Sequence, residues 1–122
     1  MKLIIGGAYQ GKRAFAMEKL GIPETQIFTC EDTHIDFSKP CIDRLEDYVL
    51  ACIRAGIDPM EQLKEQDLSD KVIIFMDIFC GVVPIDATMR LWRHTTGLVC
   101  QYLAQNADSV SRIYCGLEQR LK

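Results

Sequence analysis

The sequence lacks any apolar run near the length that crosses a membrane. A membrane-spanning helix needs about 20 consecutive apolar residues, whereas the apolar segments of this chain are short and interrupted by charged residues or glycines. The N-terminus passes from Met1 and Lys2 into a short apolar run and then two glycines, which is not the pattern of a secretory signal. We therefore expect no signal peptide, no membrane span and a cytoplasmic location.

An excess of positive charge is also missing. The chain has 14 Lys and Arg against 17 Asp and Glu, which gives a formal net charge of −3 at pH 7. Because a nucleic-acid backbone is held by a positive surface, we expect no nucleic-acid partner.

The six cysteines lack the spacing of a metal site or of a disulfide framework. No pair has the spacing Cys-x-x-Cys, and neither histidine lies at ligand spacing from a cysteine. We expect reduced thiols that fill small apolar positions in the core of a cytosolic protein.

Length and patterning predict one domain, residues 1–122, with alternating strands and helices. The chain is 48% hydrophobic and 25% charged, as in a globular protein. Apolar runs predict strands at Leu3–Ile5, Gln26–Cys30, Val72–Met76 and Val110–Cys115. Helical spacing and caps predict helices over Lys12–Leu20, between Pro40 and Gly56, over Pro59–Gln66 and over Asp86–Ala107, with Leu117–Lys122 as a short tail. This alternation predicts a three-layer α/β domain with a mainly parallel sheet.

A glycine-rich segment joins the first expected strand to the first expected helix. It fits the pattern G-x-x-x-x-G-K, in which glycines turn successive backbone N–H groups into one concavity and the lysine reaches the phosphates of a nucleotide. The alternative is an ordinary strand-to-helix turn with an exposed lysine. The expected nucleotide-binding residues are Gly6, Gly7, Ala8, Tyr9, Gln10, Gly11, Lys12 and Arg13.

Arg13 departs from this motif. The position normally carries Ser or Thr, whose hydroxyl coordinates Mg²⁺, and a guanidinium cannot ligate a cation. Either the metal is held by other groups or catalysis is weakened.

Acidic and basic candidates lie outside the glycine loop. Asp77 follows the apolar run Val72–Met76, where a carboxylate commonly holds Mg²⁺ directly or through water, although a turn cap is an equal alternative. His34 and His94 are candidate nucleophiles or general bases, although a lone histidine is more often a surface residue. The candidate catalytic residues are Lys12, Asp77 and His34, with Asp77 as the metal ligand.

Other charged groups have a simpler interpretation. Arg90 and Arg93 could clamp a phosphate, but such a pair more often forms a solvated helix face. Asp43, Glu46 and Asp47 are expected on the solvated face of a helix whose apolar stripe includes Ile42 and Leu45.

Two segments form a joint pattern that resembles a known family. The first is Ile4–Lys12, with its Gly-Gly-Ala start. The second runs from Asp77 through Gly81-Val82-Val83-Pro84, Arg90, Arg93, Gly97, Gln101, Leu103-Ala104, Asp108, Gly116 and Lys122. Together they resemble the opening and the carboxyl-terminal pattern of the bifunctional adenosylcobinamide kinase and adenosylcobinamide-phosphate guanylyltransferase family of cobalamin biosynthesis.

The resemblance implies a P-loop nucleoside-triphosphate-hydrolase-type fold and a homo-oligomer. It also implies phosphoryl transfer to the aminopropanol hydroxyl of adenosylcobinamide, followed by transfer of GMP from GTP through a guanylylated histidine. Residues Gly6–Lys12 would hold the phosphates of GTP or ATP, and Asp77 lies where the family has an acidic residue. The family has Ser in place of Arg13 and a longer middle region with a basic context around its histidine, which the residues around His34 do not reproduce. Guanylyl transfer is therefore the less expected activity.

Three hypotheses follow. The first is an enzyme of cobalamin biosynthesis that binds GTP or ATP and phosphorylates a corrinoid side-chain alcohol. The second is a catalytically silent nucleotide- or phosphate-binding regulatory module, in which the Arg13 guanidinium replaces a cation. The third is a globular subunit whose loop binds nothing.

Overall fold

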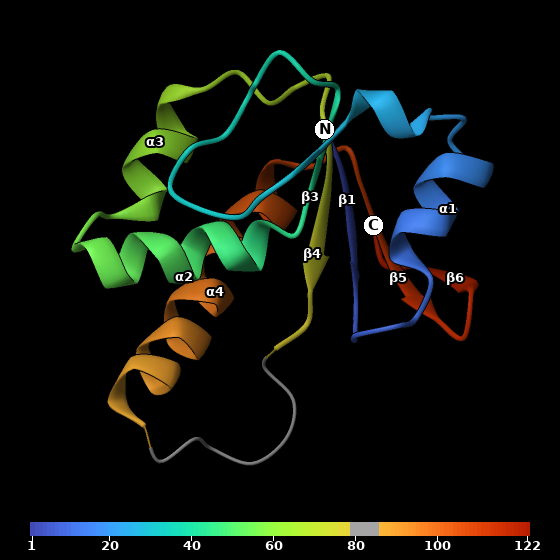
Figure 1. The fold of residues 1–122 in the computed structure, drawn as a ribbon. Helices are drawn as coiled ribbons and strands as arrows, with labels where there is room; N and C mark the ends of the chain where they lie inside the picture. The colour runs from blue at the N-terminus through green and yellow to red at the C-terminus, as the bar shows by residue number, and fades with distance from the viewer. Residues whose placement is uncertain (79–85) are drawn as a thin grey trace.

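Six strands form one sheet in the order β2-β3-β4-β1-β5-β6 (Figure 1). The structure is a computed structural model that describes residues 1–78 and 86–122. Neighbouring strands are parallel except for the antiparallel pair β5 and β6. The strands are β1 (Lys2–Gly6), β2 (Ile27–Thr29), β3 (Cys41–Asp43), β4 (Val72–Met76), β5 (Ser109–Tyr114) and β6 (Leu117–Arg120). The expected α/β fold with a mainly parallel sheet is confirmed.

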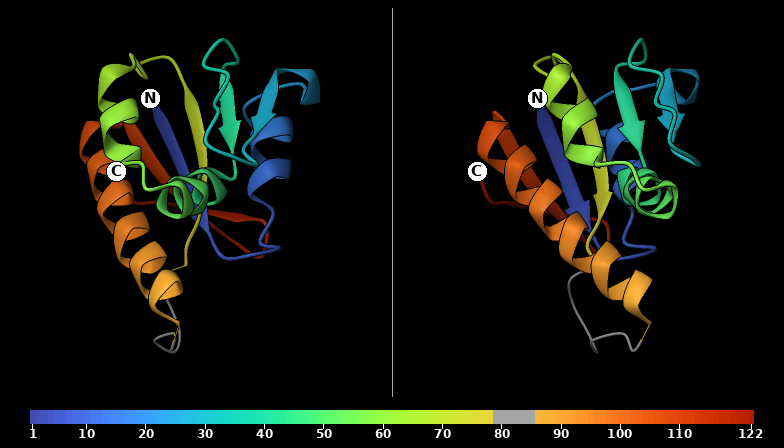
Figure 2. Two further views of the ribbon diagram at one scale, coloured as in Figure 1. Left: turned by 60° about the vertical axis from the view of Figure 1, so that its left-hand side comes forward. Right: turned by 90° about the vertical axis from the view of Figure 1, so that its left-hand side faces the viewer.

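Helices cover both faces of the sheet (Figures 1 and 2). One face packs against α1 (Lys12–Glu18), whose Ala16 is buried among apolar residues of the sheet. The other face packs against α2 (Leu45–Ala55), α3 (Pro59–Glu65) and α4 (Ala87–Asn106). A short 3-10 helix, η1 (Glu24–Gln26), precedes β2. The helices and the sheet together form three layers.

The central strand β4 explains why its sequence is continuously apolar. Ile73 and Phe75 belong to the core beneath α2 and α4, whereas Ile74 belongs to the core beneath α1. A strand buried on both faces has no solvent side and therefore no alternation of polar residues. Its observed bounds match the expected ones.

Two helix starts also match. The Asp58 carboxylate accepts a hydrogen bond from the Met60 N–H (3.0 Å), and the Asp86 carboxylate accepts one from the Met89 N–H (3.1 Å). These caps satisfy N–H groups that a helix leaves without an internal partner. The expected turn at Gly81–Pro84 lies outside the described residues.

The expected helix between Pro40 and Gly56 begins later than predicted. Cys41–Asp43 form strand β3, which pairs with β2 and β4, and α2 begins only at Leu45. Ile42 has helical spacing to Leu45, but Arg44 lies between them with a φ of 59° and separates strand from helix. A three-residue strand is too short for its own period to reveal it.

The expected tail at the carboxyl end is also a strand. Leu117–Arg120 return antiparallel to β5 through a turn at Cys115 (φ 52°) and Gly116 (φ 75°). Positive φ at both central residues suits a two-residue hairpin, but cysteine at the first of them gives no sequence signal for it. Cys115 is exposed in this turn, so it does not fill a core position as expected, whereas Cys30, Cys41 and Cys52 are buried.

Within the described ranges, none of the helices combines the length and the apolar character needed to cross a membrane.

Candidate functional site

The loop between β1 and α1 requires glycine at two positions. A Cβ atom on Gly6 would lie 2.6 Å from the backbone oxygen of Ile113, so no side chain fits there. Gly11 has a φ of 93°, which other residues rarely adopt. The motif glycines are therefore explained by close strand packing and by the sharp entry into α1.

The β5–β6 turn supports this loop from the other side. The Gly116 N–H donates to the backbone oxygen of Gln10 (2.9 Å), and the Cys115 N–H donates to the Gln10 side-chain oxygen Oε1 (2.7 Å). Both backbone and side chain of Gln10 are thus held by a hairpin far away in the sequence.

The Lys12 side chain extends back over the glycine loop that precedes it. Its Nζ donates to the backbone oxygen of Gly7 (2.6 Å). Burial lowers the pKa of Lys12, while the carboxylates of Glu46, Asp43 and Asp77 act in the opposite direction. The ammonium group is therefore partly removed from water and faces a group of acidic residues.

A cavity of about 480 Å³ opens beside Lys12. Cavities of this size are in the range that holds small molecules. It is lined by loop residues on one side and by the carboxyl ends of β3 and β4 and the start of α2 on the other. The lining residues are Ala8, Tyr9, Gln10, Gly11, Lys12, Arg13, Ala14, Asp43, Arg44, Glu46 and Met76.

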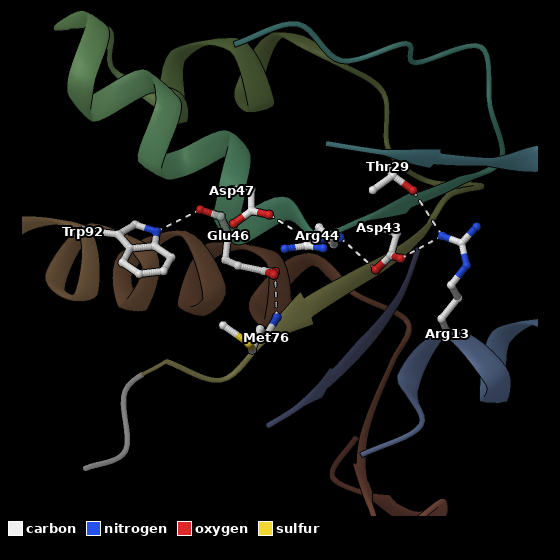
Figure 3. A network of polar contacts seen from close by, with 8 residues as sticks. All are labelled: Arg13, Thr29, Asp43, Arg44, Glu46, Asp47, Met76 and Trp92. Atoms are coloured by element: carbon white, nitrogen blue, oxygen red, sulfur yellow. Dashed lines mark hydrogen bonds and ion pairs between the residues drawn. The ribbon is translucent and has the colours of Figure 1, made fainter. Parts of the chain in front are cut away.

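Arg13 pairs with Asp43 at the end of β3 (Figure 3). Its guanidinium donates to Asp43 Oδ2 (3.0 Å) and to Thr29 Oγ1 (3.1 Å), and it lies 3.6 Å from Glu24. Asp43 is 7% exposed, and the ion pair satisfies a carboxylate that is nearly removed from water. Arg13 thereby ties α1 to two strands of the sheet.

Asp43 and Glu46 do not lie on a solvated helix face as expected. Glu46 is 4% exposed, and its Oε1 accepts a hydrogen bond from the Met76 N–H at the end of β4 (2.9 Å). Its backbone oxygen accepts one from the indole N–H of Trp92 on α4 (2.8 Å; Figure 3). Burial raises the pKa of Glu46.

The sequence contained a signal that could have placed Asp43 at the end of a strand. Asp43 directly follows the apolar pair Cys41-Ile42, just as Asp77 follows β4. In a parallel sheet both strand ends lie at the same edge. The helical spacing of Ile42 and Leu45 concealed the strand.

The donor set does not form a ready Mg²⁺ site. One carboxylate oxygen of Asp43 already accepts a hydrogen bond from the Arg13 guanidinium, and the other accepts one from the backbone N–H of Arg44 (2.8 Å). Across the part of the chain that the structure describes, no group of three or more His, Cys, Asp or Glu side chains could hold a metal ion. The described residues therefore offer no metal site built from protein groups alone, so a Mg²⁺ ion here would depend on the phosphates of a bound nucleotide.

The candidate catalytic residues are only partly brought together. The Asp77 N–H donates to the backbone oxygen of Gly6 (2.7 Å), and its charge acts on Lys12, so both lie at the loop. His34 does not line the cavity in the described residues. Its N–H donates to Asp32 (2.8 Å), and its ring packs edge-on against Phe28 at 5.9 Å.

The remaining candidates lie on α4. Arg90, Arg93 and His94 line a second, larger cavity of about 740 Å³ together with Gly97 and neighbouring residues of the same helix. None of the three lines the cavity beside Lys12 in the described residues.

No protein-family model matches the chain, and its sequence matches none of the curated proteins compared with it.

Proposed function

We propose that the chain binds the phosphate groups of GTP or ATP at Gly6–Lys12 and transfers a phosphoryl group to a corrinoid side-chain alcohol. The observation that carries this proposal is the position of Lys12, whose ammonium lies across the glycine loop and beside a cavity of about 480 Å³. Lysines in this position of the motif bind the terminal phosphates of a nucleotide.

The contacts of Lys12 favour an anionic ligand. In the structure its Nζ donates to a neutral carbonyl, that of Gly7. A phosphate oxygen would replace that partner with a charged one, and hydrogen bonds between ionised groups are about twice as strong as neutral ones. Partial burial strengthens the effect because less water competes for the ammonium.

The acceptor rests on the sequence resemblance. The pattern from Asp77 to Lys122 supports a relative of adenosylcobinamide kinase, and the same resemblance supports a homo-oligomer. In this proposal Lys12 stabilises the transferred charge and Asp77 orients the hydroxyl or holds the metal that accompanies the nucleotide. Guanylyl transfer has less support, because His34 is absent from the described cavity lining.

A second function has an observation in its favour. The Arg13 guanidinium, which lines the loop cavity, is held in place by its ion pair with Asp43. A protein built in this way could bind nucleotide without a metal and without turnover, as a regulatory module.

Calorimetric titration tests binding. Wild-type protein is titrated with GTP and with ATP, each with and without Mg²⁺, beside Lys12→Ala. Lys12→Ala should weaken binding about 10-fold or more, the value of a lost hydrogen bond to a charged group. Lys19→Ala removes the same charge from an exposed site at the end of α1 and should bind as wild type. Absence of binding, or equal affinity in all three proteins, would refute the site.

Arg13→Ser separates the two functions. If the protein is an impaired kinase, the restored hydroxyl should raise Mg²⁺-dependent release of nucleoside diphosphate in the presence of adenosylcobinamide. Tight, Mg²⁺-independent binding by the wild type, with no turnover in either protein, would favour the module. Denaturation curves of both proteins are needed as a control, since the substitution leaves the nearly buried Asp43 without its ion pair.

A further inference from the structure

Strand β6 forms an exposed edge of the sheet. It lies at the end of the strand order, and among the described strands only β5 pairs with it. All its residues are exposed, and large apolar side chains gather around it: Tyr114 is 62%, Leu117 72% and Leu121 53% exposed. An open edge with exposed apolar groups is a template for pairing with another strand.

The register identifies which backbone groups face outward. The Leu121 N–H donates to the backbone oxygen of Val110 on β5 (2.8 Å). Because residues of an antiparallel pair alternate between bonded and non-bonded positions, Leu117 and Gln119 also face β5. The N–H and C=O groups of Glu118 and Arg120 therefore point away from the sheet, toward any further strand.

The edge sequence is complementary to itself. Residues 117–121 read Leu-Glu-Gln-Arg-Leu. When this segment is placed antiparallel to a second copy of itself, apolar residues oppose apolar residues and the acidic residue opposes the basic one. If two copies run antiparallel with a two-fold axis at Gln119, each Glu118 faces the other copy's Arg120. Each Leu117 then faces the other copy's Leu121.

The outward backbone groups fit the same register. Glu118 and Arg120 become hydrogen-bonded pairs, and Gln119 faces its own copy in a non-bonded pair. Glu118 and Arg120 are two residues apart in β6, so their opposite charges share one face of the sheet, next to a cavity of about 440 Å³ that both line. One Glu118 oxygen, Oε2, accepts a hydrogen bond from Ser111 Oγ (2.6 Å), which leaves Oε1 for a partner's arginine. Because successive residues of a strand alternate, Leu117 and Leu121 belong to the other face, although Leu117, beside the hairpin turn, also lines this cavity.

We propose that two copies of this chain associate through β6, in antiparallel register about Gln119, so that their two sheets become continuous. A second copy of this chain is the expected partner for two reasons. The charges of Glu118 and Arg120 are complementary between two copies, and the backbone groups of the same residues point outward from the sheet. The association does not depend on nucleotide binding or on transferase activity.

Charge reversal tests the register. Sedimentation velocity over a range of protein concentrations should show wild-type dimers. Glu118→Arg or Arg120→Glu alone places like charges opposite each other at two symmetric positions and should weaken the dimer about 10-fold. The double variant Glu118→Arg/Arg120→Glu restores opposite charges and should recover it. Glu65→Arg, an exposed charge reversal on α3, serves as the control.

Disulfide cross-linking provides a second measurement. Facing residues of a non-bonded antiparallel pair have Cα atoms about 4.5 Å apart, which suits a disulfide. Gln119→Cys in a Cys115→Ser background should therefore give a covalent dimer under mild oxidation, whereas the Cys115→Ser protein should not. A monomer at every concentration, or a dimer that neither responds to charge reversal nor cross-links at position 119, would overturn the proposal.

Discussion

Single residues at the carboxyl edge of the sheet have environments that their neighbours in sequence do not reveal. Glu46, in the first turn of α2, is nearly buried, accepts the Met76 N–H and lies close enough to Lys12 to act on its charge. Arg13, next to the motif lysine, points to Asp43 and Thr29. Both side chains are fixed by partners more than ten residues away, and both line the candidate phosphate cavity.

Glu46 should make stability depend on pH. Burial raises the pKa of Glu46 above its usual 4.5, so between the unfolded and folded pKa the folded protein binds more protons than the unfolded chain. The contribution of this group to the free energy of unfolding therefore falls as pH rises through that window. Glu46→Gln keeps an acceptor for the Met76 N–H but cannot ionise, so it should gain stability relative to wild type as pH rises from 4.5. Urea denaturation of both proteins at several pH values measures this, and a difference that stays constant with pH would contradict it.

At the scale of elements, the glycine loop between β1 and α1 is supported by a hairpin from the other end of the chain. The turn between β5 and β6 donates two backbone hydrogen bonds to Gln10, one to its backbone and one to its side chain. At the start of the loop, the backbone oxygen of Gly6 also accepts a hydrogen bond from the Asp77 N–H. Its shape therefore depends on neighbours on both sides of β1 as well as on its own glycines.

Removing the Gln10 side chain should loosen one of these contacts selectively. In Gln10→Ala the Cys115 N–H loses its acceptor, whereas the Gly116 N–H still donates to the backbone oxygen of residue 10. Since a hydrogen bond contributes about 1 kcal/mol, amide hydrogen exchange at Cys115 should accelerate about fivefold. Exchange at Gly116 is the internal reference. An equal change at both amides, or none at Cys115, would refute this contact.

At the scale of the whole molecule, two apolar cores lie on opposite faces of one sheet. Successive residues of strands β1 and β4 belong alternately to the two cores. These two strands therefore connect the α1 layer to the layer of α2, α3 and α4. The cysteines differ in their exposure: Cys30, Cys41 and Cys52 are buried, whereas Cys115 is exposed at the hairpin turn.

This distribution predicts the order of thiol reactivity. The reactive species is the thiolate, and burial raises the pKa of Cys41 to about 12 and that of Cys100 to about 11. Native protein treated briefly with iodoacetamide should therefore carry the label at Cys115 before it appears at Cys30, Cys41, Cys52 or Cys100. Peptide mass spectrometry identifies the sites, and labelling in urea should remove the difference. Equal labelling of Cys41 and Cys115 in the native protein would contradict the predicted order.

The sequence by itself determined the elements whose signals are local. The continuous apolar run of β4, the caps Asp58 and Asp86, and the glycine loop between β1 and α1 all depend on residues close together in the chain. These features also sufficed to predict the mainly parallel α/β sheet and the position of Lys12 at a strand-to-helix turn.

Only the tertiary structure decided features that require distant partners. Strands β3 and β6 are too short to show a period of their own and exist because β4 and β5 provide hydrogen-bonding neighbours. Asp43 and Glu46 look solvated in sequence, since a charged residue near a helix start normally faces water. They are buried because the fold places Arg13 and the Met76 N–H against them, and no local pattern records which distant groups will be available as partners.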